Sequence, residues 1–270
     1  MRAVVSASFD PITQKELEWI VSCRRMKGCQ TLYVHMPEEG ILSYSLRRKL
    51  LKRALAPYRH IHVTEKVSPE DTVMYLPDGS GDGEAVRSGI VRLAARGTRN
   101  MLWHETEFLE LCVQSRCTEQ RASHSVSVAK TAEYFAARYG LDRERMRIAG
   151  YLHDITKKQS NEENLRVMNF WYPEFAAENY KVWHSFTAEV FLRQEMCCYD
   201  RIIRSAVRHH TLGDGMSDHD RILYIADKIE PTRPYPIDTE WKIAERSLKE
   251  AAEFIFEETR QFIDTEEKNV

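Results

Sequence analysis

The pattern of hydrophobic and polar positions changes once along the chain, near residue 118. Before that point, short apolar runs alternate with helix-type spacing in the order 2–8, 14–26, 31–36, about 45–56 and about 60–65. Strand, helix, strand, helix, strand is typical of a parallel sheet with covering helices. Beyond it, apolar residues recur every three or four positions, which predicts α-helices. We therefore predict a small α/β domain with a parallel sheet over residues 1–115 and an all-α helical bundle over residues 116–270.

Local signals refine the prediction within the first domain. A glycine-rich loop at 77–83 lacks the spacing of known phosphate-binding loops, so we expect a flexible connection there. A helix is expected next, with Val86, Ile90 and Leu93 on one face.

Terminal signals divide the second domain into helices. Gly140 is placed to end the first helix, Asp142 to cap the second and Ser160 to open another through a capping box. The predicted segments are 119–139, 143–153, one from 160, one from Pro173, 184–195, 199–209, 217–229 and a long final helix capped by Thr239. The apolar stripe of that final helix, from Trp241 to Phe262, is interpreted as ordinary core or interface.

Composition narrows the class of protein. The chain of 270 residues is 43% hydrophobic and 30% charged with a net charge of −2, which is typical of a globular protein and does not call for nucleic acid or a membrane surface as partner. No apolar run approaches the roughly 20 residues that span a bilayer, and the N-terminus shows no signal-peptide core. Six cysteines without C-x-x-C spacing indicate reduced structural thiols rather than a disulfide framework. The cytoplasm is the expected compartment.

Polar side chains interrupt the apolar faces of several predicted helices. They are His124, His153 with Asp154, His184, one of the adjacent His209 and His210, and Asp227. One such histidine is ordinarily a hydrogen-bonded core residue, and one such aspartate a surface residue or an arginine partner. Burying an unpaired carboxylate is costly, however, and convergence on metal ions explains all the interruptions together. Imidazoles and carboxylates in this mixture suit Fe, Mn, Co, Ni or Zn.

Four strings connect these residues to a known family. They are RASHS at 121–125, GYLHDITK at 150–157, AVRHHT at 206–211 and YIADKIEPTR at 224–233, with WHS at 183–185 the loosest match. Over about residues 118–235 they resemble the HD superfamily of phosphohydrolases, and within it the bacterial symmetrical bis(5′-nucleosyl)-tetraphosphatase family. The resemblance assigns the ligand role to His210 and leaves His209 as a variable neighbour.

The resemblance implies a metal-dependent hydrolase of dinucleoside polyphosphates. Two divalent ions, with iron expected, would be held by His124, His153, Asp154, His184, His210 and Asp227. Asp154 would bridge the ions, and a hydroxide between them would attack phosphorus in line. Lys157 would act with Asp154 in catalysis, while Arg121, Lys157, Thr211 and Arg233 would bind substrate. The implied substrate is diadenosine tetraphosphate, split into two ADP.

Two alternatives stay open from the sequence. One is an HD phosphohydrolase acting on another nucleotide, and the other is a nucleotide-sensing protein without turnover. The expected partner is a nucleotide in each case, and a homodimer stays open.

The start of the chain carries a second resemblance. SFDPI at 8–12 is similar to the first half of the G-[ST]-F-D-P-I-H-x-G-H motif of the nicotinate mononucleotide adenylyltransferase family. Thr13, Gln14, Lys15 and Glu16 stand where H-x-G-H belongs, and Thr and Glu cannot supply the proton-donating imidazoles. The resemblance implies a Rossmann-like fold and a degenerate, inactive transferase domain. A live nucleotidyltransferase is the less favoured alternative, and nucleotide binding or packing are the open roles.

Overall fold

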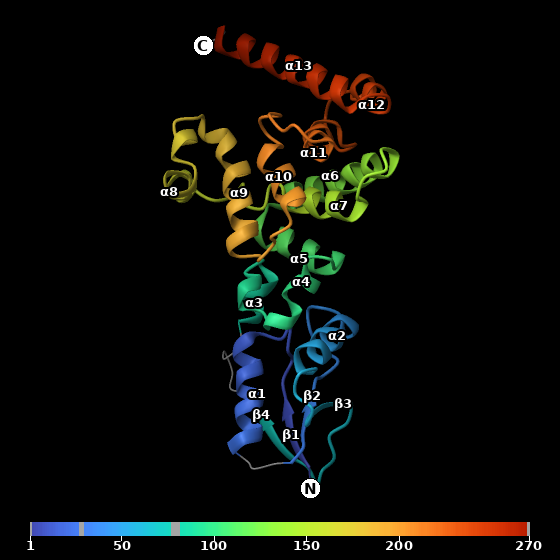
Figure 1. The fold of residues 1–270 in the computed structure, drawn as a ribbon, viewed down its shortest axis with the longest axis vertical. Helices are drawn as coiled ribbons and strands as arrows, with labels where there is room; N and C mark the ends of the chain where they lie inside the picture. The colour runs from blue at the N-terminus through green and yellow to red at the C-terminus, as the bar shows by residue number, and fades with distance from the viewer. Residues whose placement is uncertain (1, 27–29, 77–81, 269–270) are drawn as a thin grey trace. The chain divides into compact units, whose positions relative to one another are not determined.

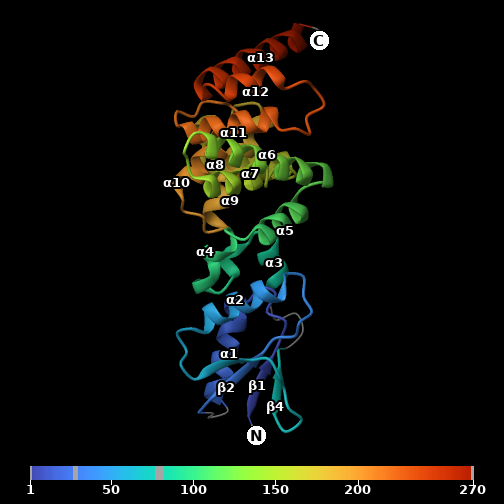
Figure 2. The same cartoon turned by 90° about the vertical axis from the view of Figure 1, so that its right-hand side faces the viewer.

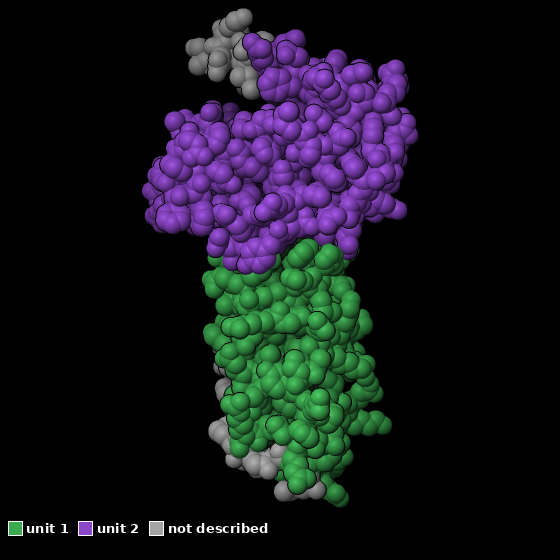
Figure 3. Space-filling model, viewed as in Figure 1, with its two compact units in different colours: residues 1–111, 195–197 green, residues 112–194, 198–270 purple. Residues whose placement is uncertain are grey.

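The computed structural model describes residues 2–26, 30–76 and 82–268. The chain divides into two compact units (Figure 3): unit 1 comprises residues 1–111 and 195–197, and unit 2 comprises 112–194 and 198–270.

Unit 1 is built on a parallel four-stranded sheet. The strands are β1 (Ala3–Ser6), β2 (Leu32–His35), β3 (Ile61–Thr64) and β4 (Thr72–Tyr75), in the order β3-β2-β1-β4. In β1, Val4 and Val5 point to opposite faces of the sheet and both are fully buried, so both faces are covered. Helices α1 (Gln14–Met26) and α2 (Tyr44–Leu55) lie beside the sheet (Figures 1 and 2). The predicted α/β class is confirmed.

Two details of unit 1 differ from the sequence prediction. The edge strand β4 was not predicted, because it is only four residues long and these are exposed or only half-buried. The prediction of one helix through Val86, Ile90 and Leu93 is wrong. Gly89, with a φ of 94°, interrupts it, since this left-handed backbone cannot continue a helix. The segments observed are α3 (Gly83–Arg87), η1 (Val91–Leu93), η2 (Arg96–Thr98) and α4 (Arg99–Leu102). Most of the predicted glycine-rich loop lies outside the described residues.

Unit 2 is a helical bundle, as predicted. Helix α5 (Thr106–Arg116) contains the division between the units. The others are α6 (Glu119–Arg138), α7 (Arg143–Leu152), α8 (Asn161–Trp171), η3 (Pro173–Phe175), η4 (Tyr180–Val182), α9 (Trp183–Gln194), α10 (Arg201–His209), α11 (Asp218–Ile229), α12 (Asp238–Ala244) and α13 (Leu248–Lys268). Asp142 caps α7, and Ser160 forms the expected capping box with Glu163. Gly140 follows α6 with a φ of 67°, which is the left-handed conformation of a helix end.

The final helix is two helices rather than one. The break falls between α12 and α13, and Thr239 lies inside α12 instead of capping it. Ala244, Leu248, Ala251 and Ile255 are buried, so most of the apolar stripe is core in both helices. The side chain of Phe262 lies outside the described residues.

The cysteines and the lengths of the apolar helices bear on two further expectations. The five cysteines among them are buried and form no disulfide. No helix in the described ranges is long and apolar enough to cross a membrane.

Candidate metal centre

Six buried His and Asp side chains meet in unit 2, and all are predicted ligands. They are His124 on α6, His153 and Asp154 at the end of α7, His184 at the start of α9, His210 at the end of α10 and Asp227 on α11. Their exposed fractions lie between 0% and 9%. His209 instead lies 2.7 Å from the Asp214 carboxylate, which leaves His210 as the member of the cluster.

Helix ends and one glycine bring these side chains together. His153 is the C-cap of α7, and His210 is the C-cap of α10. Because α7 ends at His153, that side chain and Asp154 can both face the cluster. Gly150 allows α7 to approach α6 closely, since a Cβ at this position would overlap the backbone of Ala129. The end of α7 therefore lies next to the α6 helix that carries His124.

The six residues form two groups that share one carboxylate. The ligand atoms of His124, His153 and Asp154 lie within 4.8 Å of one another, as do those of Asp154, His184 and His210. Asp154 Oδ2 is 3.5 Å from Nε2 of His153, and Oδ1 is 3.2 Å from Nε2 of His184. Asp154 thus presents one oxygen to each group.

Asp227 belongs beside the first group. Its Oδ1 is 3.0 Å from His124 Nε2 and 3.7 Å from His153 Nε2. The arrangement gives the first group two imidazoles and two carboxylates.

Hydrogen bonds at the outer nitrogens fix which electron pairs face inward. Nδ1 of His153 lies 2.7 Å from the Gly150 carbonyl, and Nδ1 of His210 lies 2.6 Å from the Val207 carbonyl. A carbonyl accepts only, so each Nδ1 must donate and each neutral ring turns an unprotonated Nε2 inward. The buried His153 Nε2 has no hydrogen-bond partner. Electron pairs of imidazoles and carboxylates therefore converge, and a bound cation is the group that satisfies them. The donor set fits a transition-metal or zinc centre.

The protonation states of His153, His184 and Asp154 agree with this fit. Burial lowers the pKa of His153 to about 3 and that of His184 to about 4, so both imidazoles are neutral near pH 7. Burial alone would raise the pKa of Asp154, but the surrounding imidazoles of His153, His184 and His210 hold it well below its ordinary value. Neutral imidazoles and ionised carboxylates are the states that metal binding requires.

The four predicted substrate-binding residues lie at the edge of the cluster. Arg121 is paired with Asp154, and Arg233 NH2 lies 2.9 Å from Asp227 Oδ1. On the other side, Lys157 Nζ is 2.9 Å from His184 Nδ1, and Thr211 Oγ1 is 3.1 Å from His184 Nε2. The structure thus brings all four predicted residues to the centre.

Two further residues at the centre were missed by sequence reasoning. Lys228 Nζ lies 2.6 Å from Asp227 Oδ2, and Glu230 Oε1 lies 3.0 Å from His124 Nδ1. Both belong to the string at 224–233, so the matching motif was the one available signal. Their contacts with residues of the cluster could not be inferred from spacing.

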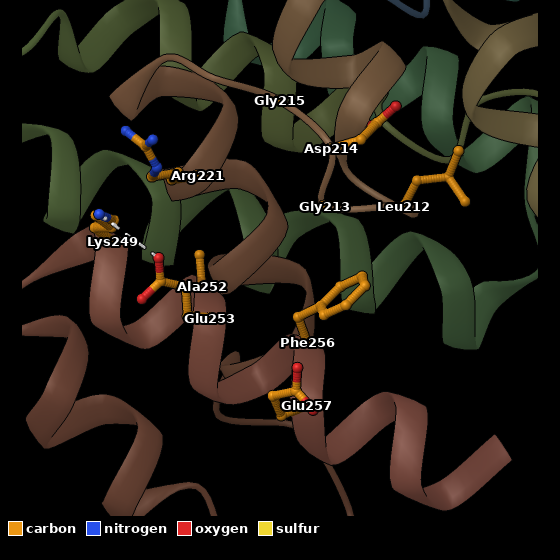
Figure 4. A pocket seen from close by; sticks show the side chains of 10 residues that line it. All are labelled: Leu212, Gly213, Asp214, Gly215, Arg221, Lys249, Ala252, Glu253, Phe256 and Glu257. Carbon is orange, nitrogen blue, oxygen red and sulfur yellow. Dashed lines mark ion pairs between the residues drawn. The ribbon is translucent and has the colours of Figure 1, made fainter. Parts of the chain in front are cut away.

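A cavity of about 560 Å³ opens beside the first group. Its lining includes Arg121, His124, Glu230 and Arg233. A second cavity, of about 610 Å³, lies between the 212–215 loop and α13 (Figure 4). The described lining of the second cavity contains none of the predicted site residues and mixes charges of both signs. The first cavity is therefore the one that adjoins the candidate centre.

In unit 1, the polar groups of the motif-like stretch at 8–16 make hydrogen bonds with other groups of the same unit. Glu16 Oε2 accepts from the Thr13 amide at 2.7 Å and from the Thr13 hydroxyl at 2.8 Å, which forms a capping box on α1. Asp10 accepts from the amides of Ile41 and Leu42 at 2.6 and 3.0 Å. These polar groups are already satisfied, and they stabilise the local fold.

Comparison with known proteins agrees with the geometry of unit 2. The model of the HD domain family matches residues 121–232. The symmetrical bis(5′-nucleosyl)-tetraphosphatase of Bacillus subtilis is 33% identical over 144 residues, which are 52% of this chain and 77% of the relative. The chain belongs to the HD domain family, and its helical unit is a hydrolase of that family. The resemblance predicted from the sequence is confirmed.

Two other known proteins match part of the chain. A probable nicotinate-nucleotide adenylyltransferase/Ap4A hydrolase of Mycoplasma genitalium is 31% identical over 49% of this chain and 40% of its own length. Among solved structures, a predicted HD superfamily hydrolase involved in NAD metabolism from Clostridium acetobutylicum shares 29% identity with a TM-score of 0.57. That match covers 60% of this chain and 88% of the neighbour.

Proposed function

We propose that unit 2 hydrolyses dinucleoside polyphosphates and splits diadenosine tetraphosphate symmetrically into two ADP. The observation that carries the proposal is the carboxylate of Asp154, which is shared by two groups of inward-facing imidazoles. The named activity of the Bacillus subtilis relative supports the choice of substrate. We place this chemistry in the cytoplasm.

Each group of ligands would hold one divalent ion. His124, His153, Asp154 and Asp227 would hold the first, and Asp154, His184 and His210 the second. Iron is our first candidate for both, with Mn, Co, Ni and Zn as the alternatives. Ions of this kind lower the pKa of a coordinated water and neutralise charge on phosphate oxygens.

The surrounding side chains bind and orient the substrate. Arg121 and Arg233 line the cavity and can each grip phosphate oxygens with two parallel N–H groups. Lys157 and Thr211, beside His184, would contact the phosphates from the other side. We expect the polyphosphate to lie across the centre between these two sides. Whether the tetraphosphate is cleaved in its middle then depends on how these four residues position the tetraphosphate.

Unit 1 is proposed to be a degenerate transferase domain. Its Thr13–Glu16 capping box occupies the positions where the related motif carries imidazoles. We place the functional boundary at residues 115 and 116, with the hydrolase over 116–270.

The proposal is tested by incubating the metal-loaded chain with diadenosine tetraphosphate and separating the products. ADP as the sole product, abolished by Asp154→Ala, supports it. AMP together with ATP would refute symmetrical cleavage. A metal-loaded protein without turnover of any dinucleotide would favour a nucleotide sensor instead.

A further inference from the structure

The imidazoles of the centre are oriented in two different ways. His153 and His210 each direct Nδ1 at a carbonyl three residues earlier in the same helix. His124 lies within α6, where the carbonyls of the helix are engaged by its own amides. Its Nδ1 contacts instead the carboxylate of Glu230, which is 106 residues away in sequence. The orientation of His124 therefore depends on the Glu230 side chain, which can be changed without altering α6.

Glu230 is itself held firmly. It is 1% exposed, and its carboxylate accepts hydrogen bonds from the Thr232 amide at 2.7 Å and from the Thr232 hydroxyl at 2.8 Å. Ser127, one turn after His124 on α6, also donates to it. A carboxylate with this many donors is fixed in position, so the imidazole that it contacts is fixed as well.

Glu230 also organises the turn that carries Arg233, through its backbone carbonyl and its side chain. The Arg233 amide donates to the Glu230 carbonyl at 3.1 Å, and the Arg233 guanidinium donates to the Asp227 carbonyl at 2.9 Å. Thr232, between them, is bonded to the Glu230 side chain. His124 and Arg233, two parts of the cavity wall, are thus positioned from one residue.

We infer that Glu230 is a positioning residue that sets the tautomer of His124 and aims its Nε2 at the first metal ion. The inference rests on the proposed metal centre. A carboxylate that accepts from Nδ1 keeps the proton there and leaves Nε2 unprotonated, as a ligand must be. It also increases the electron donation of the ring. Nε2 lies 3.0 Å from Asp227 Oδ1, which places it beside the second carboxylate of the same group.

The variant Glu230→Gln tests the inference, because it keeps the size of the side chain and removes the charge. Glu189→Gln is the matched control. Glu189 is also buried in unit 2 and paired, with Arg204 at 2.7 Å and Tyr172 at 3.0 Å, yet it contacts none of the six residues. The measurement is metal affinity by chelator competition with Mn²⁺. The ¹⁵N shifts of the histidine side chains in the Zn²⁺-loaded protein report the tautomers.

We expect Glu230→Gln to lower the affinity for one of the two ions by about 10–100-fold and to leave the other unchanged. The His124 signals should shift, and Glu189→Gln should leave both affinities and those signals as in the wild type. Equal affinities in Glu230→Gln and the wild type, or equal losses in the two variants, would overturn the inference.

Different measurements test the proposed function and the role of Glu230: turnover tests the first, and metal affinity tests the second. A wild-type chain that binds two Mn²⁺ but does not cleave diadenosine tetraphosphate contradicts the proposed reaction, whereas the role of Glu230 is still decided by the affinities. A wild-type chain that binds no metal contradicts both.

Discussion

The beginning of α1 in unit 1 and the cluster at the end of α7 in unit 2 both bury ionisable side chains, but they satisfy them differently. In unit 1 the carboxylates of Asp10 and Glu16 meet backbone and hydroxyl donors. In unit 2 the buried Nε2 of His153 meets no donor and faces carboxylate oxygens. Burial of a polar group is therefore not enough to indicate function. What distinguishes the two places is that donors of the chain satisfy the carboxylates of Asp10 and Glu16, whereas Nε2 of His153 is left without a partner among acceptor atoms.

This difference explains why the carboxylates at the start of α1 stabilise the local fold, whereas the cluster at the end of α7 can hold a metal ion. Imidazole and carboxylate acceptors that converge around an unpartnered nitrogen are stabilised by a cation, because their mutual repulsion is large in a buried site. A capping box needs no ligand, since its partners are already supplied by the chain. Each of the following predictions separates the two cases.

The largest expected effect is on turnover. Asp154→Asn should lower kcat by about 1000-fold or more, on the order of 4 kcal/mol, because both groups of ligands lose their shared charge. Asp10→Asn in unit 1, which also removes one buried charge, should leave kcat unchanged. Steady-state kinetics on diadenosine tetraphosphate measures both. Similar losses in the two variants would remove the distinction between the units.

Removal of metal should destabilise one unit only. A ligand present at about 100 times its Kd stabilises the folded state by about 2.7 kcal/mol, and a chelator removes this contribution. We expect amide hydrogen exchange to accelerate in α6 and α7 after chelation, while α1 and α2 keep their rates. Uniform acceleration in both units, or none in unit 2, would contradict the assignment of the centre.

The stability of the chelated protein should depend on pH with opposite signs in the two units. In unit 2 the pKa values of His153 and His184, about 3 and about 4, lie below their ordinary value of 6.5. The unfolded chain then binds more protons, so the free energy of unfolding falls as the pH drops below about 6.5. Each of these groups contributes up to about 1.4 kcal/mol per pH unit. Burial would lower the pKa of His124, but Asp227 and Glu230 raise it, which offsets part of this loss.

In unit 1 burial raises the pKa of Glu16 above its ordinary value. The folded state of that group binds its proton more readily, so protonation of Glu16 stabilises unit 1 as the pH falls through the raised pKa. Hydrogen exchange of α1 and α7 at pH 7, 6 and 5 measures both trends. Parallel trends in the two helices would contradict the prediction.

The smallest expected effect is on the stability of unit 1 when the capping box of Thr13 and Glu16 is removed. Glu16→Ala should lower the stability of unit 1 by about 1 kcal/mol through the lost hydrogen bonds with Thr13. Turnover should not change. Chemical denaturation monitored by hydrogen exchange in α1, with kinetics on the same sample, tests both statements. A fall in kcat would show that this part of unit 1 contributes to the reaction.

Much of the fold could be predicted from local signals. Apolar stripes and caps such as Asp142 and Ser160 identify helices because they act within a few residues. The errors arose where such signals were weak. β4 is a half-exposed edge strand, and Gly89 ends a stripe that looks continuous in sequence.

The members of the candidate site could also be proposed from the sequence, since costly polar residues stand out on apolar faces. Their hydrogen-bond partners could not. The contact between Glu230 and His124 joins residues 106 positions apart, and no periodicity links them. Such contacts are set by the packing of α6 against α11 and follow only from the folded chain.

The central claim is that Asp154 is shared by two metal ions, and anomalous diffraction from crystals loaded with Mn²⁺ tests it most directly. We expect two peaks that both adjoin the Asp154 carboxylate, one beside His124 and His153 and the other beside His184 and His210. A single peak away from Asp154, or no peak in this cluster, would contradict the claim.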